Sequence, residues 1–89
     1  MKERRRKRSL LPDQPYGQWE NYAKGLIEGA MMRREIRYKE LSQRLKNVGI
    51  DESPDQINRK INRKRFSAAF LLACLRAMEV DSISLVAWK

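Results

Sequence analysis

Residues 53–66 read SPDQINRKINRKRF, and this stretch decides the fold that the sequence predicts. Ser53 is a residue type that caps helices, and Pro54 follows it at the first helical position, where proline is favoured. Gln56 stands three residues after Ser53, which is the spacing of a capping box. The sequence therefore predicts a helix over residues 54–64.

The predicted helix has one apolar side and one basic side. Ile57 and Ile61 are four residues apart, so they lie on the same face and define the buried direction. Asn-Arg-Lys occurs twice at the same four-residue offset, and the stacked like charges destabilise an isolated helix by a few tenths of a kcal/mol per pair. Helical stability alone does not favour this repetition, whereas a polyanionic partner that neutralises the charge does.

The composition also favours such a partner. The chain has 89 residues, with 20 Lys and Arg against 11 Asp and Glu, and its formal net charge is +9. This length indicates one small domain, and the charge favours nucleic acid first and an anionic membrane second. Histidine is absent, which removes the commonest general base and the commonest zinc ligand. We therefore expect no enzyme, and no catalytic residue, metal, cofactor or small-molecule substrate.

Two helices are expected before residue 53. The first spans residues 17–34 and the second residues 39–48, because apolar residues recur there at helical spacing. Gly49 can take the left-handed conformation that closes the second helix, and Ile50 can fold back onto this cap. The positions expected to face the core are Trp19, Ala23, Leu26, Ile27, Ala30 and Met31 in the first helix, and Leu41, Leu45 and Val48 in the second.

A fourth helix is expected after Ser67, which can cap it. Its broad apolar face consists of Phe70, Leu71, Cys74, Leu75 and Met78. Cys74 is the only cysteine, so an intrachain disulfide is excluded and a reducing compartment is expected. On an apolar face, this cysteine is expected to be a small buried hydrophobe.

The two ends of the chain differ from the middle. Residues 1–16 are expected to form a disordered basic arm, because six of the first eight residues are Lys or Arg and prolines follow. Residues 81–89 form an apolar segment whose side chains alternate as in a strand, but it is too short to decide its conformation. We find no export signal and no stretch of transmembrane length, so we expect a cytoplasmic protein, associated with the nucleoid when bound to DNA.

The run YKELSQRL (residues 38–45), followed by INRKRFSAAFLLACLRAMEV (residues 61–80), resembles the lambda-repressor-like, Xre-type helix-turn-helix. The chain is closer to a small uncharacterised bacterial domain family of that type, over about residues 19–80. The pattern of that family falls on Trp19, Tyr38, Leu41, Leu45, Gly49, Ile57, Lys60, Ile61, Arg63, Phe66, Ser67, Phe70, Cys74 and Leu75. Two features depart from these patterns. Lys64 stands where glycine is usual. The connection from Gly49 to Ser53 is longer than the short turn of the repressors, and the small residue that is usual in that turn corresponds to Ser42.

This resemblance implies an all-α bundle of four to five helices, with a helix-turn-helix domain at residues 17–80 that binds duplex DNA and regulates transcription. Arginine can pair with guanine in the major groove, and asparagine or glutamine with adenine. The base-reading residues expected on helix 54–64 are Gln56, Arg59, Asn62 and Arg63. The residues expected to contact phosphates are Arg37, Tyr38, Lys39, Lys60, Lys64 and Arg65. The arm residues Arg4, Arg5, Arg6, Lys7 and Arg8 are expected to follow the DNA backbone or to enter the minor groove.

Other interpretations stay open at this point. A basic surface with a flexible arm also suits a structured-RNA or ribosome-associated binder, and the apolar C-terminal segment suits an adaptor that binds a protein. A homodimer is expected, because one recognition helix reads few base pairs and Ile83, Leu85, Val86 and Trp88 offer a contact surface. The alternative is that Leu85 and Trp88 fold back onto the first helix. Trp19 is expected in the core and not in a base-stacking site, because no basic cluster adjoins it in the sequence.

Overall fold

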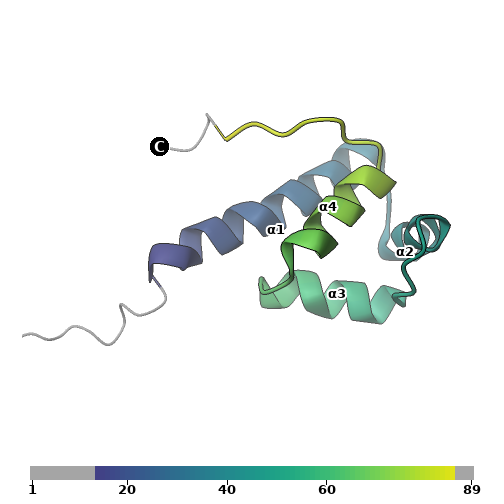
Figure 1. The fold of residues 1–89 in the computed structure, drawn as a ribbon, viewed down its shortest axis with the longest axis horizontal. Helices are drawn as coiled ribbons and strands as arrows, with labels where there is room; N and C mark the ends of the chain where they lie inside the picture. Colours follow the sequence, from purple (N-terminus) through teal and green to yellow (C-terminus); the bar gives the residue numbers. More distant parts are fainter. Residues whose placement is uncertain (1–13, 86–89) are drawn as a thin grey trace, which may run out of the picture.

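The structure is a computed structural model that describes residues 14–85, and these residues form four α-helices (Figure 1). The helices are α1 (Gln14–Arg34), α2 (Tyr38–Asn47), α3 (Pro54–Arg63) and α4 (Ala68–Ala77). The described residues contain no β-strand, and the predicted all-α fold class is confirmed. None of the four helices is both long enough and apolar enough to cross a membrane.

The helices begin and end within three residues of the predicted positions. The largest difference is at α1, which begins at Gln14, inside the segment predicted to be a disordered arm. Pro15 falls in the first turn of α1, where its missing N–H breaks no helical hydrogen bond. The remainder of the predicted arm, residues 1–13, lies outside the described residues, as do residues 86–89.

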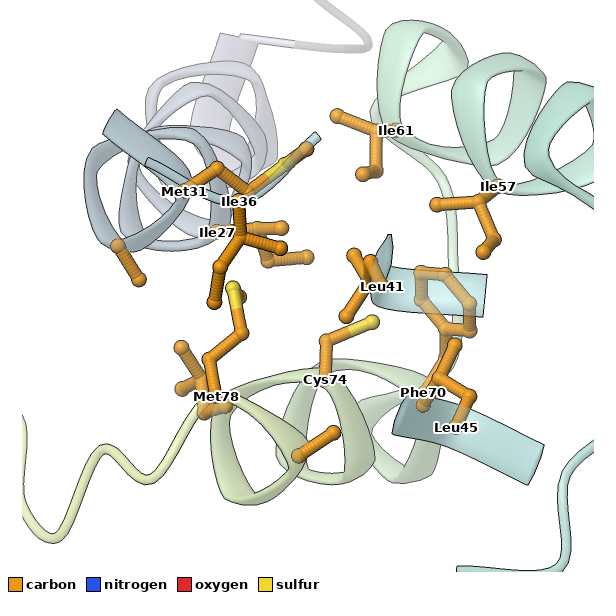
Figure 2. Close-up of a cluster of buried hydrophobic side chains, with 13 residues drawn as sticks. Ile27, Met31, Ile36, Leu41, Leu45, Ile57, Ile61, Phe70, Cys74 and Met78 are labelled. Atoms are coloured by element: carbon orange, nitrogen blue, oxygen red, sulfur yellow. The ribbon is translucent and has the colours of Figure 1, made fainter. Parts of the chain in front are cut away.

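Side chains from all four helices meet in one core (Figure 2). α2 packs against α3 and α4, and α1 contacts the same two helices from another side. The buried core consists of Ile27, Ala30, Met31, Ile36, Leu41, Leu45, Ile57, Ile61, Phe70, Cys74, Leu75, Ala77 and Met78. The apolar face predicted for the fourth helix is therefore confirmed, with Leu71 partly buried at its edge.

Two residues predicted to face the core are exposed instead. Val48 is 49% exposed because it is the C-cap of α2, where the backbone has left the helical conformation and helical spacing no longer applies. Ile50 packs against the core instead. Trp19 is 41% exposed, since it precedes the part of α1 that enters the core, which begins with the fully buried Ile27.

The Cys74 thiol is fully buried in this core (Figure 2). Burial raises its pKa to about 12; the charge of Glu52 adds to this rise and that of Lys60 opposes it. Because the nucleophilic form of cysteine is the thiolate, the protonated Cys74 is unreactive at neutral pH. The interpretation as a small buried hydrophobe is confirmed.

Three helices end in the same left-handed turn. Glu35, Gly49 and Glu79 have φ angles of 55°, 88° and 62° and follow the last turns of α1, α2 and α4. The next residue in each case donates its N–H to the carbonyl five residues earlier at 2.9 Å, which is the Schellman motif. These next residues, which also pack into or against the core, are Ile36, Ile50 and Val80.

Glycine should be preferred at two of these turns where the chain has glutamate. Glu79→Gly removes the cost of holding a residue with a β-carbon at positive φ, about 1–2 kcal/mol. The greater conformational entropy of glycine in the unfolded chain offsets about 0.5–1 kcal/mol of this gain. We expect the free energy of unfolding to rise by about 0.5 kcal/mol in a denaturant titration. Glu79→Ala keeps the β-carbon and should bring no gain. Equal stabilities of the two variants would contradict this account of the turn.

Candidate nucleic-acid interface

The N-terminus of α3 forms the predicted capping box. The Gln56 N–H donates to Ser53 Oγ at 3.1 Å, and the Ser53 N–H donates to Gln56 Oε1 at 2.8 Å. Reading adenine takes both the oxygen and the nitrogen of the amide. The Gln56 oxygen is already engaged in the capping box, so Gln56 in this conformation does not present a complete amide to adenine.

The outer face of α3 presents two arginines. Ile57 and Ile61 are fully buried, and Arg59, Asn62 and Arg63 on the other side of the helix are exposed. None of the carboxylates between residues 14 and 85 pairs with Arg59 or Arg63, whereas Arg44, Lys60 and Arg65 each have one. The two α3 guanidinium groups therefore keep their donors available for a ligand.

Asn62 is oriented by its neighbour one turn earlier. Its Nδ2 donates to the Asn58 carbonyl oxygen at 2.9 Å and also to Asn58 Oδ1. The Asn-Arg-Lys repeat places the two amides one above the other, so this pairing follows from the repeat. It holds the Asn62 amide on the same exposed face as the arginines.

Lys60, predicted to contact a phosphate, has partners within the fold. Its Nζ lies 2.5 Å from Glu52 Oε2 and 5.0 Å from the centroid of the Phe70 ring. The Glu52 carbonyl in turn accepts a hydrogen bond of 2.6 Å from Ser42 Oγ, which is buried in α2. Lys60 thus joins α3 to the long α2–α3 connection and to α4.

The two residues that follow α3, Lys64 and Arg65, are basic, and Arg65 is paired with a carboxylate of α1. Lys64 is the C-cap of α3 and has a φ angle of 63°, the left-handed conformation that the usual glycine adopts without strain. Arg65 Nε lies 3.5 Å from Glu20 Oε2 on α1. Both side chains remain accessible, with Lys64 half-buried and Arg65 exposed.

Of the three residues predicted to contact a phosphate at the start of α2, two are exposed and one packs against the core. Arg37 is the N-cap in an extended conformation, and its side chain does not cap the helix. Arg37 and Lys39 are exposed, whereas the Tyr38 ring packs partly buried against the core. The two charged residues flank backbone N–H groups that the N-cap side chain leaves uncapped, which is an arrangement suited to an anion.

The sequence of the chain matches a family model described as a domain of unknown function, DUF6471, over residues 19–83. The chain belongs to this family. The match covers α2, α3, α4 and most of α1, and so includes every described residue predicted to form the interface. No curated protein and no solved structure matches the chain.

One group of residues, most of them in the DUF6471 domain, was missed by the sequence analysis. Tyr16 and Trp19, from the start of α1, line a groove together with Lys64, Arg65 and Phe66. Trp19 therefore does adjoin a basic cluster, and the reason given against a stacking role was wrong. No pattern in the sequence indicates this proximity, because α2 and α3 separate the two segments.

The described interface residues fall into two groups. The α3 face and the basic residues that follow it lie together, and α1 begins beside the end of α3 (Figure 1). Arg37 and Lys39 lie where α2 begins, at the end of the molecule where α3 starts (Figure 1). The predicted arm residues 4–8 lie outside the described residues.

Proposed function

We propose that this DUF6471 domain is a lambda-repressor-like helix-turn-helix protein that binds specific duplex DNA sites and regulates transcription. The observation that carries the proposal is the pair Arg59 and Arg63, exposed and without an ionic partner among residues 14–85. The two side chains lie one turn apart on a helix anchored by Ile57 and Ile61. The major groove of B-DNA admits one such helix.

In this arrangement α3 lies in the major groove. Arg59 and Arg63 each present a planar fork that can donate two hydrogen bonds to guanine O6 and N7. The Asn62 nitrogen is bonded to Asn58, so Asn62 reads adenine through Oδ1, which accepts from adenine N6, unless its amide turns away from Asn58 on binding. Lys64 and Arg65 neutralise phosphates at one end of α3, and Arg37 and Lys39 do so from the start of α2. Lys60, held by Glu52 and Phe70, sets the angle at which α3 enters the groove.

The RNA-binding alternative is less favoured by the shape of this surface. A-form RNA has a deep, narrow major groove that side chains cannot read, so a convex helix bearing arginines suits B-DNA better. The adaptor alternative rests on exposed apolar residues at the other end of the chain, Leu72, Ile83 and Leu85. It does not use the α3 arginines.

Selection from a library of random DNA duplexes tests the proposal. We expect a short motif to be enriched, with guanine at the positions that Arg59 and Arg63 contact. A matched pool of structured RNA serves as the competitor. Enrichment of no DNA motif, or retention on RNA alone, would rule out sequence-specific duplex binding.

We also propose that the protein acts as a two-fold dimer, since one α3 reads too few base pairs to single out a site. Leu72 and Ile83 line one surface groove between α4 and the segment that follows it, and are 61% and 43% exposed. Leu85 is 57% exposed. The Tyr22 hydroxyl donates to the Ser84 carbonyl, so the segment after α4 runs along α1. Its exposed apolar side chains remain accessible to a second copy of the chain.

Sedimentation equilibrium on the full chain and on a chain ending at Asp81 measures this association. We expect a dimer for the full chain and a monomer for the shorter one, because Ile83 and Leu85 are lost. If both are monomers and the shorter chain is only less stable, the C-terminal segment belongs to the monomer core.

A further inference from the structure

A groove opens between the start of α1 and the turn from α3 to α4. It is an open surface groove with a volume of about 440 Å³. Its apolar walls are aromatic: Tyr16 is 73% exposed, Trp19 is 41% exposed and Phe66 is half-buried. Trp19 packs edge-on against Tyr22, at 6.3 Å between ring centroids and 83° between ring planes.

The charges around this groove are mainly positive. Lys64 and Arg65 stand on its rim, and its one carboxylate, Glu20, is already paired with Arg65. α1 begins at the groove, and the six Lys and Arg among the first eight residues of the chain precede it. This concentration of positive charge favours a polyanion in the groove.

We propose that this groove binds single-stranded nucleic acid. Bases stack on Trp19 and on Tyr16, and the flanking phosphates lie against Lys64 and Arg65. Aromatic side chains beside a basic track are the usual means of binding unpaired strands, because every base offers a π-face whatever its sequence. The site shares Lys64 and Arg65 with the proposed duplex interface, but it does not use Arg59 or Arg63, so the two activities can be separated by substitution.

Fluorescence of Trp19 tests the proposal directly. The chain has two tryptophans, so Trp88→Phe leaves Trp19 as the only indole. We would titrate this variant with oligo-dT, oligo-rU and inorganic polyphosphate of matched charge. We expect saturable quenching by the oligonucleotides and none by polyphosphate, and the tighter of the two oligonucleotides identifies the natural strand as DNA or RNA.

Four further variants, made in the Trp88→Phe chain, locate the site. Tyr16→Ala should weaken oligonucleotide binding by about 5-fold to 150-fold, the loss expected for one stacked base. Met32→Ala removes another exposed apolar side chain of α1, 79% exposed, and should change nothing. Arg59→Ala and Arg63→Ala should leave oligonucleotide binding unchanged even if duplex binding is lost.

Four results would overturn the proposal. The first is an absence of quenching, and the second is equal quenching by polyphosphate, which would mean charge attraction alone. The third is an emission spectrum typical of a buried indole, unchanged when oligonucleotide is added. This result would mean that other residues of the chain fill the groove. Loss of oligonucleotide binding in Arg59→Ala would place the strand on α3 instead.

Discussion

Ile61→Ala should lower the free energy of unfolding by about 2–5 kcal/mol, the range for removing a buried isoleucine side chain down to alanine. Ile61 is fully buried where α3 meets the core, so the variant leaves a cavity under the centre of the proposed recognition helix. A domain of this size has a total stability of roughly 5–15 kcal/mol, so the loss is a large fraction of it.

Denaturant titration followed by circular dichroism measures this loss. Met32→Ala is the matched control, because it also truncates an apolar side chain, but at a position that is 79% exposed. Its effect should stay within about 0.5 kcal/mol. Similar losses in the two variants would mean that α3 is not anchored through Ile61.

Arg59→Ala and Arg63→Ala should each cost about 1–3 kcal/mol of discrimination between a selected duplex site and random duplex, because each removes a bidentate contact with a base. Both side chains are exposed, so the stability of the fold should not change. Competition binding against random duplex measures the discrimination.

Two controls separate base reading from charge. Arg59→Lys keeps the charge but loses the planar fork, so it should lose discrimination almost as Arg59→Ala does. Lys64→Gly removes a phosphate contact at a position whose φ of 63° suits glycine, and it should weaken specific and random binding about equally. Equal loss of discrimination in all these variants would contradict base reading by α3.

The sequence alone predicts the features that depend on near neighbours. The capping box of Ser53 and Gln56, the left-handed Gly49 and the burial of Cys74 follow from spacing and residue type. Each involves residues within one or two helical turns, so capping preferences and helical periodicity are enough to predict it.

The features that the sequence did not predict depend on contacts between distant segments. The fold brings Glu52 and the Phe70 ring to Lys60, and no pattern in the sequence indicated these contacts. Trp19 was expected in the core, but the turn after α3 brings Lys64 and Arg65 beside it. Periodicity gives the direction of a side chain from its own helix and not what another segment places there.

The salt dependence of DNA binding tests the central proposal most directly. If about 6 phosphates are contacted, log K for a duplex should fall against log salt with a slope near −5, and the slope should be shallower for a chain lacking residues 1–8. Competing structured RNA in the same series should bind less tightly at every salt concentration. A slope indistinguishable from zero would contradict nucleic-acid binding by this domain.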